Sequence, residues 1–130
     1  MAIRVELIDD AVVDLVRYAT SGNLALFLKQ LIRLEAVGKD AGLPLGGNLA
    51  GYRKIVVGDR TWRIIFSTDA AETVATVLVI SDRDDAACYE EAQRRLDAMG
   101  AHRPETLSLA APMLQISEAH RAGKKGRQRT

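Results

Sequence analysis

The chain has 130 residues, 48% hydrophobic and 27% charged, with a formal net charge of +1. This is the composition of an ordinary globular protein, and the length suits one domain with a real core. A net charge this small argues neither for nor against nucleic-acid binding. Only the positions of the charged residues can indicate such binding.

Several kinds of protein are excluded. No run approaches the ~18 apolar residues of a membrane span, and Met1–Asp10 lacks the pattern of a signal peptide. The single cysteine, Cys88, cannot form an internal disulfide. We therefore expect a soluble, cytoplasmic protein whose fold depends on packing alone.

The first forty residues predict a strand and two helices. Ile3–Ile8 alternates apolar and charged residues, as a strand with one solvated face does. Asp9 or Asp10 can cap a helix with apolar residues at helical spacing, at Val12, Leu15, Val16 and Ala19. A second stripe follows the break at Ser21–Asn23, at Leu24, Phe27, Leu28, Leu31 and Leu34. Two helices so closely linked should form an antiparallel hairpin.

The next sixty residues predict three strands and a helix. Lys39–Gly42 is expected to be a frayed helix end, and Leu43–Ala50 a loop. Strands are predicted at Tyr52–Val57, Trp62–Ser67 and Thr73–Ile80, the last apolar enough to be covered on both faces. Asp82 or Asp84 can cap a third helix that runs to Met99 and stops at Gly100.

The order β-α-α-β-β-β-α predicts an α+β fold in which an antiparallel-rich sheet packs on a helical hairpin. We assign this domain to residues 1–100. Residues 101–130 are predicted to form a C-terminal helical extension, with a helix starting near Pro112, followed by a basic, disordered tail.

The hairpin around Gly58 can be divided into two faces by parity. If Val57 pairs with Trp62, one face carries apolar residues for the core, namely Ile55, Val57, Trp62, Ile64 and Phe66. The other face carries Lys54, Val56, Arg63 and Ile65. We therefore expect Lys54 and Arg63 on one open face, roughly 5 to 8 Å apart at Cβ.

Arg83 and Tyr89 are expected near the rim of the same face. Arg83 follows the third strand, and Tyr89 falls in the second turn of a helix that begins near Asp84. Fixed cations with a phenol beside them suit a polyanion such as a phosphodiester.

Three segments resemble the RelE/ParE superfamily of bacterial toxin–antitoxin systems, and its RelE-like branch in particular. They are the VEL opening before the helical hairpin, the segment GYRKIVVGDRTWRIIF, and the closing VISDRDDAACYEEAQRRL. The resemblance covers Ile3 to about Met99. It implies a toxin that cuts mRNA on the ribosome, arrests translation and needs no metal or cofactor. It also implies a cognate antitoxin protein as partner, operator DNA bound through the antitoxin complex, and no membrane.

The resemblance assigns catalytic roles to Lys54, Arg63, Arg83 and Tyr89. Arg53 and Arg60 are further candidates for RNA binding. Val56 stands where a RelE-like toxin has a second lysine, and this is a departure from the pattern.

These residue types suit RNA cleavage by in-line attack of a ribose 2′-OH. Arg63 and Lys54 can hold phosphate, Arg83 can stabilise charge in the transition state or lie near the leaving oxygen, and Tyr89 can stack on a base or take part in proton transfer. An arginine, with a pKa above about 12, is a poor general acid. Cys88, His102 and His120 lack the spacing of metal ligands, so no metal site is predicted.

Two other functions remain open because of Val56. One is a ParE-like toxin that inhibits DNA gyrase without cutting RNA. The other is a nontoxic relative that only binds an antitoxin or operator DNA.

Overall fold

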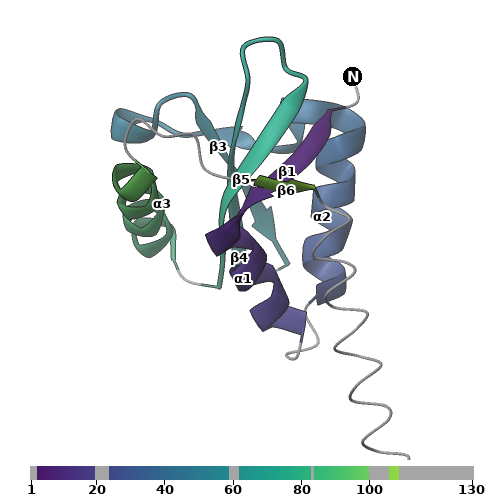
Figure 1. Ribbon diagram of the computed structural model, residues 1–130, viewed down its shortest axis with the longest axis horizontal. Helices are drawn as coiled ribbons and strands as arrows, with labels where there is room; N and C mark the ends of the chain where they lie inside the picture. Colours follow the sequence, from purple (N-terminus) through teal and green to yellow (C-terminus); the bar gives the residue numbers. More distant parts are fainter. Residues whose placement is uncertain (1–2, 20–23, 59–61, 83, 100–105, 109–130) are drawn as a thin grey trace, which may run out of the picture.

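The computed structural model describes residues 3–19, 24–58, 62–82, 84–99 and 106–108. These residues form one six-stranded sheet with the strand order β2-β3-β4-β5-β1-β6 (Figure 1). Its strands are β1 (Arg4–Ile8), β2 (Leu43–Pro44), β3 (Tyr52–Val57), β4 (Trp62–Thr68), β5 (Val74–Ser81) and β6 (Thr106–Ser108). The helices are α1 (Asp9–Ala19), α2 (Leu24–Val37) and α3 (Asp85–Met99), with 3-10 turns η1 (Gly38–Ala41) and η2 (Gly47–Leu49).

The predicted α+β class and element order are confirmed. β1 runs parallel to β5, and every other neighbouring pair in the sheet is antiparallel. Figure 1 shows α2 and α3 on opposite sides of the sheet. β5 lies between β4 and β1 and is buried from Val77 to Ser81, as a strand covered on both faces should be.

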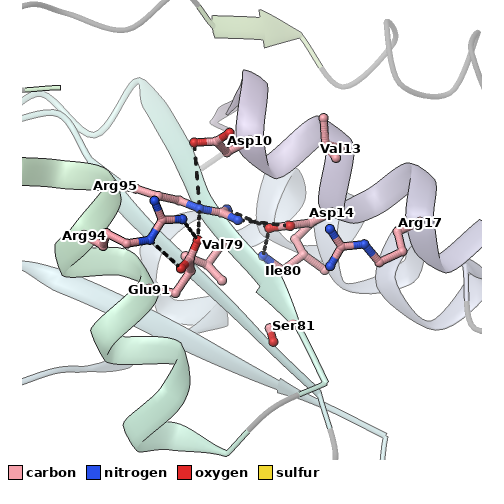
Figure 2. Close-up of a pocket in the computed structure, with 10 residues that line it drawn as sticks. All are labelled: Asp10, Val13, Asp14, Arg17, Val79, Ile80, Ser81, Glu91, Arg94 and Arg95. Atoms are coloured by element: carbon pink, nitrogen blue, oxygen red, sulfur yellow. Dashed lines mark hydrogen bonds and ion pairs between the residues drawn. The ribbon is translucent and has the colours of Figure 1, made fainter. Parts of the chain in front are cut away.

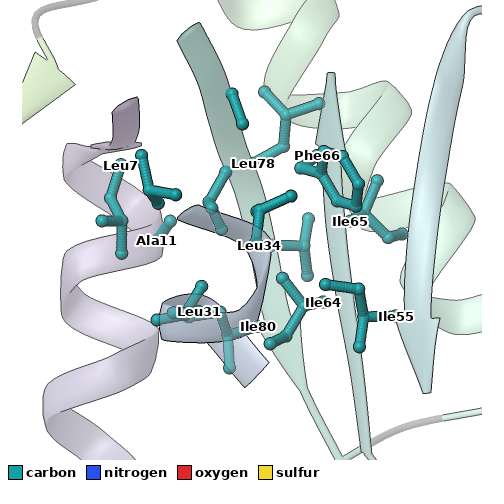
Figure 3. Packing of buried hydrophobic residues seen from close by; sticks show 14 of the residues in the cluster. Leu7, Ala11, Leu31, Leu34, Ile55, Ile64, Ile65, Phe66, Leu78 and Ile80 are labelled. Atoms are coloured by element: carbon teal, nitrogen blue, oxygen red, sulfur yellow. The ribbon is translucent and has the colours of Figure 1, made fainter. Parts of the chain in front are cut away.

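The helical hairpin covers the apolar face of the sheet. Phe27, Leu31 and Leu34 of α2 are fully buried, and they lie three and four residues apart on one helix face. The Phe27 ring lies 5.0 Å from that of Tyr18 on α1 and 5.9 Å from that of Trp62 on β4. These aromatic contacts join both helices to the β3–β4 hairpin (core shown in Figure 3).

The hairpin register is the one that parity predicted. Val57 pairs with Trp62, Val56 with Arg63, and Lys54 with Ile65. Ile55, Val57, Ile64 and Phe66 are buried, as expected of the core face. The register between β4 and β5 shifts between Ile65 and Phe66, which marks a β-bulge.

The face that carries Lys54 and Arg63 is not open, and that expectation was wrong. Ile65 belongs to this face by parity and yet is 0% exposed. The reason is α3, which packs on this side of β4 and β5 (Figure 1). Parity identified which residues share the face, but it could not say that the third helix folds back over it.

Three shorter segments also differ from expectation. The frayed end after α2 is the 3-10 turn η1, and the predicted loop contains β2, which pairs with β3, and the turn η2. Thr106–Ser108, expected within a helical extension, forms strand β6 along the edge of β1. That edge has free backbone groups, which a short extended segment can pair. The rest of residues 101–130, as well as Arg60 and Arg83, lies outside the described residues.

None of the described helices is long and apolar enough to cross a membrane.

Candidate functional site

Three of the four predicted catalytic residues lie together on the α3 side of the sheet. Lys54 extends from β3 and Arg63 from β4, and their side chains are 19% and 14% exposed. The Lys54 Nζ lies 5.9 Å from the centre of the Tyr89 ring on α3. The sheet register and the packing of α3 therefore bring these three side chains into one site, whereas Arg83 is outside the described residues.

A fourth residue, Asp85, joins the two cations. Its Oδ2 accepts a hydrogen bond from Lys54 Nζ at 3.0 Å, and its Oδ1 accepts one from Arg63 Nε at 2.6 Å. The carboxylate thus uses one oxygen for each cation. We call Lys54, Arg63 and Asp85 the Asp85 cluster.

The start of α3 fixes the position of Asp85. Asp84 caps the helix, because its Oδ1 accepts a hydrogen bond from the backbone N–H of Ala87 at 2.8 Å. Asp85 is then the first helical residue, and Tyr89 follows one turn later on the same helix face. Sequence reasoning missed Asp85, although the i, i+4 spacing from Tyr89 was a signal that both side chains face the same strands.

Lys54 and Asp85 each favour the charged form of the other. Hydrogen bonds to Asp85 first and Tyr89 second raise the pKa of Lys54. The hydrogen bond from Lys54, followed by that from Arg63, lowers the pKa of Asp85 against an opposing effect of burial. Lys54 is therefore a protonated donor here and suits the binding of phosphate better than the removal of a proton.

Arg53 is engaged elsewhere. Its Nη1 donates hydrogen bonds to the backbone oxygens of Gly42 at 3.0 Å and Lys39 at 3.3 Å. It thereby holds η1 against the sheet. Its predicted contact with RNA stays a prediction, as does that of Arg60, which lies outside the described residues.

A second polar cluster lies near the other end of α3 (Figure 2). Arg95 donates through Nη1 to Asp14 Oδ2 of α1 and to the backbone oxygen of Leu78, both at 2.7 Å, and through Nη2 to Asp14 Oδ1 at 3.1 Å. Asp14 Oδ2 also accepts from the backbone N–H of Ile80 at 3.0 Å. We call Arg95 and Asp14 with these backbone partners the Arg95 cluster.

The Arg95 cluster provides hydrogen-bond partners for backbone groups along one edge of β5. β1 pairs with β5 only as far as Leu7 and Val77, so the next backbone groups of β5 on that edge need other partners. Asp14 and Arg95 supply them. A cavity of about 330 Å³ lies beside the cluster, with Asp10, Val13 and Arg17 of α1 on one side and Glu91 and Arg94 of α3 on the other.

The remaining candidate groups add no chemistry of their own. Cys88 is buried, and burial raises the pKa of its thiol. No His, Cys, Asp and Glu side chains within the described ranges form a group of three that could hold a metal ion. His102 and His120 lie outside those ranges.

Comparisons with known proteins agree with the architecture. No protein-family model matches the chain, and no curated protein matches it. Among solved structures, it is similar to a chain of the toxin–antitoxin complex RelBE2 from Mycobacterium tuberculosis. The TM-score is 0.55 and the identity 24%, over 64% of this chain and all of the other. This likeness confirms the RelE-like fold expected from the sequence.

Proposed function

We propose that this protein is the toxin of a toxin–antitoxin pair and that it acts as a metal-independent, ribosome-dependent mRNA endonuclease. One observation carries the proposal: Lys54, Arg63 and Tyr89, drawn from two strands and a helix, meet at one site of a RelE-like fold. Convergence of cations and a phenol from separate elements is typical of sites that bind and react with phosphodiesters.

Each side chain has a task in such a reaction. The ribose 2′-OH attacks the adjacent phosphorus and loses its proton, the P–O5′ bond breaks, and the leaving oxygen gains a proton. Arg63 and Lys54 bind the nonbridging phosphate oxygens and neutralise the charge that builds on them. Tyr89 stacks on a base or moves a proton. Arg83, by the resemblance, stabilises the transition state.

A cognate antitoxin is the proposed protein partner. The similar structure is a toxin–antitoxin complex, which supports a partner of this kind for the present chain. Operator DNA would then be bound through the complex of toxin and antitoxin.

Expression of the chain alone tests the activity. Induction should stop growth, and primer extension on cellular mRNA should reveal new 5′ ends within translated regions. Arg83→Ala and Tyr89→Ala should relieve both effects. Arg94→Ala is the matched control, because this arginine lies on the same helix with its side chain 67% exposed. Growth arrest with intact mRNA would rule out the nuclease.

Val56 favours a second candidate, a ParE-like toxin that inhibits DNA gyrase. It is an aliphatic residue directly opposite Arg63 in the register, so this position has no group that can transfer a proton. This candidate predicts that the purified protein inhibits DNA supercoiling by gyrase and leaves translated mRNA whole. An unchanged supercoiling rate at saturating protein would dismiss it.

A further inference from the structure

The cations of the candidate site already hold an anion, and that anion belongs to the chain itself. Asp85 presents one carboxylate oxygen to Lys54 and the other to Arg63. A phosphodiester would present its two nonbridging oxygens to the same pair of donors and carries the same single negative charge. The carboxylate therefore occupies the place where a backbone phosphate would bind.

We propose that Asp85 is a built-in competitor for this anion site, and that an RNA phosphate binds between Lys54 and Arg63 only by displacing its carboxylate. The inference rests on the proposed function in taking RNA as the ligand. It adds that in the folded protein the carboxylate of Asp85 occupies the site between Lys54 and Arg63 until a polyanion displaces it.

The exposures of the three side chains favour the carboxylate as the part that leaves. Asp85 is 42% exposed, whereas Lys54 and Arg63 are 19% and 14% exposed. A partly exposed carboxylate can rotate into solvent and regain its hydration, while the cations remain held by the sheet. The helix start does not depend on Asp85, because Asp84 supplies the cap.

Because the carboxylate of Asp85 is exchanged for a phosphodiester of the same charge, the site discriminates between single phosphate groups and RNA strands. A single phosphodiester group gains little, because the contacts it makes replace those that the carboxylate gives up. An RNA strand gains more, since its other nucleotides add stacking and phosphate contacts that Asp85 does not offset. The competitor thus favours polymers over single phosphate groups.

Asp85→Asn is the informative variant and Asp84→Asn is its matched control. Both remove one negative charge from the same helix turn, and asparagine also caps helices well, so Asp84→Asn keeps the start of α3. Asp85 contacts Lys54 and Arg63, whereas Asp84 accepts a hydrogen bond from the backbone N–H of Ala87. The difference between the two variants therefore isolates the competing contact from the general change in charge.

Binding is measured by fluorescence anisotropy at fixed salt. The probe is a 2′-O-methyl RNA of about ten nucleotides, which has no free 2′-OH and cannot be cut. We expect Asp85→Asn to bind it about tenfold more tightly than wild type, equivalent to ~1.4 kcal/mol. Asp84→Asn should improve binding by no more than about twofold.

Equal affinities of the two variants, or weaker binding by Asp85→Asn, would overturn the proposal and make Asp85 a residue that positions the cations. Absence of RNA binding in all three proteins would overturn it too. If Asp85→Asn does not fold, Asp85→Ser removes the carboxylate and keeps a residue suited to the helix start. Because the probe cannot be cleaved, tighter binding would support the competitor even if mRNA in cells stayed intact, a result that would reject the nuclease alone.

Discussion

Helix α3 is joined to the rest of the domain by two ionic clusters of different character. In the Arg95 cluster, the side chains of Arg95 and Asp14 are 9% and 4% exposed. In the Asp85 cluster, Asp85 is 42% exposed and its cations are 14% and 19% exposed. The first cluster lies toward the C-terminal end of the helix, and the second lies at its N-terminal end.

The two clusters also differ in the groups to which they are hydrogen-bonded. Arg95 and Asp14 bind each other and two backbone groups of β5. The partners that the described residues provide for the Asp85 carboxylate are side chains, and Asp85 is partly exposed. The same kind of ion pair is thus bonded to backbone groups where it is buried and to side chains where it is partly exposed.

Loss of Arg95 should have the largest effect on stability. Arg95→Ala leaves the carboxylate of Asp14 buried without its cation, and removing one partner of a buried pair costs about 3 to 5 kcal/mol. Urea unfolding should show this loss. Arg94→Ala, which breaks a solvent-exposed pair with Glu91 on the same helix, should cost far less. Equal losses for the two variants would remove the distinction between the clusters.

Loss of a cation from the Asp85 cluster should change binding more than stability. Lys54→Met keeps the length of the side chain and removes its charge, so the free energy of unfolding should fall by about 1 kcal/mol or less. Affinity for the uncleavable RNA should fall about tenfold, since a charge-assisted phosphate contact is lost. A variant that unfolds as readily as Arg95→Ala would show that this cluster is structural as well.

The loss of folding stability at low pH should depend in part on the protonation of Asp85. Its pKa in the folded protein is lowered below the unfolded value of about 3.9. Its stabilising contribution is therefore present above that value and lost as pH falls through the folded pKa. Wild type should lose slightly more stability than Asp85→Asn between about pH 4 and pH 2, by under ~1 kcal/mol because the group is partly exposed. Parallel curves for the two proteins would contradict the assigned pKa shift.

The smallest expected effect concerns Cys88. The thiol lies on the buried face of α3, and burial raises its pKa, so reaction with a thiol reagent should be slow in the folded protein. Arg95→Ala should speed the reaction by loosening α3, whereas Asp85→Asn should leave it unchanged. Acceleration in both variants would mean that the two clusters fix the helix jointly.

Much of the fold could be predicted from local patterns. The pairing of Val57 with Trp62 followed from the alternation of apolar residues, because a slip by one residue would have placed Lys54 among the core residues. The helices followed from the spacing of Phe27, Leu31 and Leu34 and similar stripes. Such signals lie within a few residues of one another, and so one sequence is enough to read them.

The features that sequence reasoning missed depend on contacts between distant segments. Arg95 and Asp14 are 81 residues apart, and neither looks unusual in its own helix. Asp85 could not be predicted from a pattern of cations, because it carries the opposite charge. The grouping of Lys54, Arg63 and Tyr89 followed from parity and helix spacing, but the carboxylate between the cations depends on how α3 lies across the strands.

The parallel pairing of β1 with β5 has a consequence for the order in which the chain can fold. The first strand finds its partner only when Val74–Val77 are available, and Asp14 must wait for Arg95. During synthesis, β1 therefore remains without its partner until Val74–Val77 have been made, and Asp14 remains without Arg95 until most of α3 has been made. Contacts so distant in sequence slow folding, since the intervening chain must be closed before they form. The Asp85 cluster, which needs β3, β4 and the start of α3, is likewise completed only after the first strand and helix have been made.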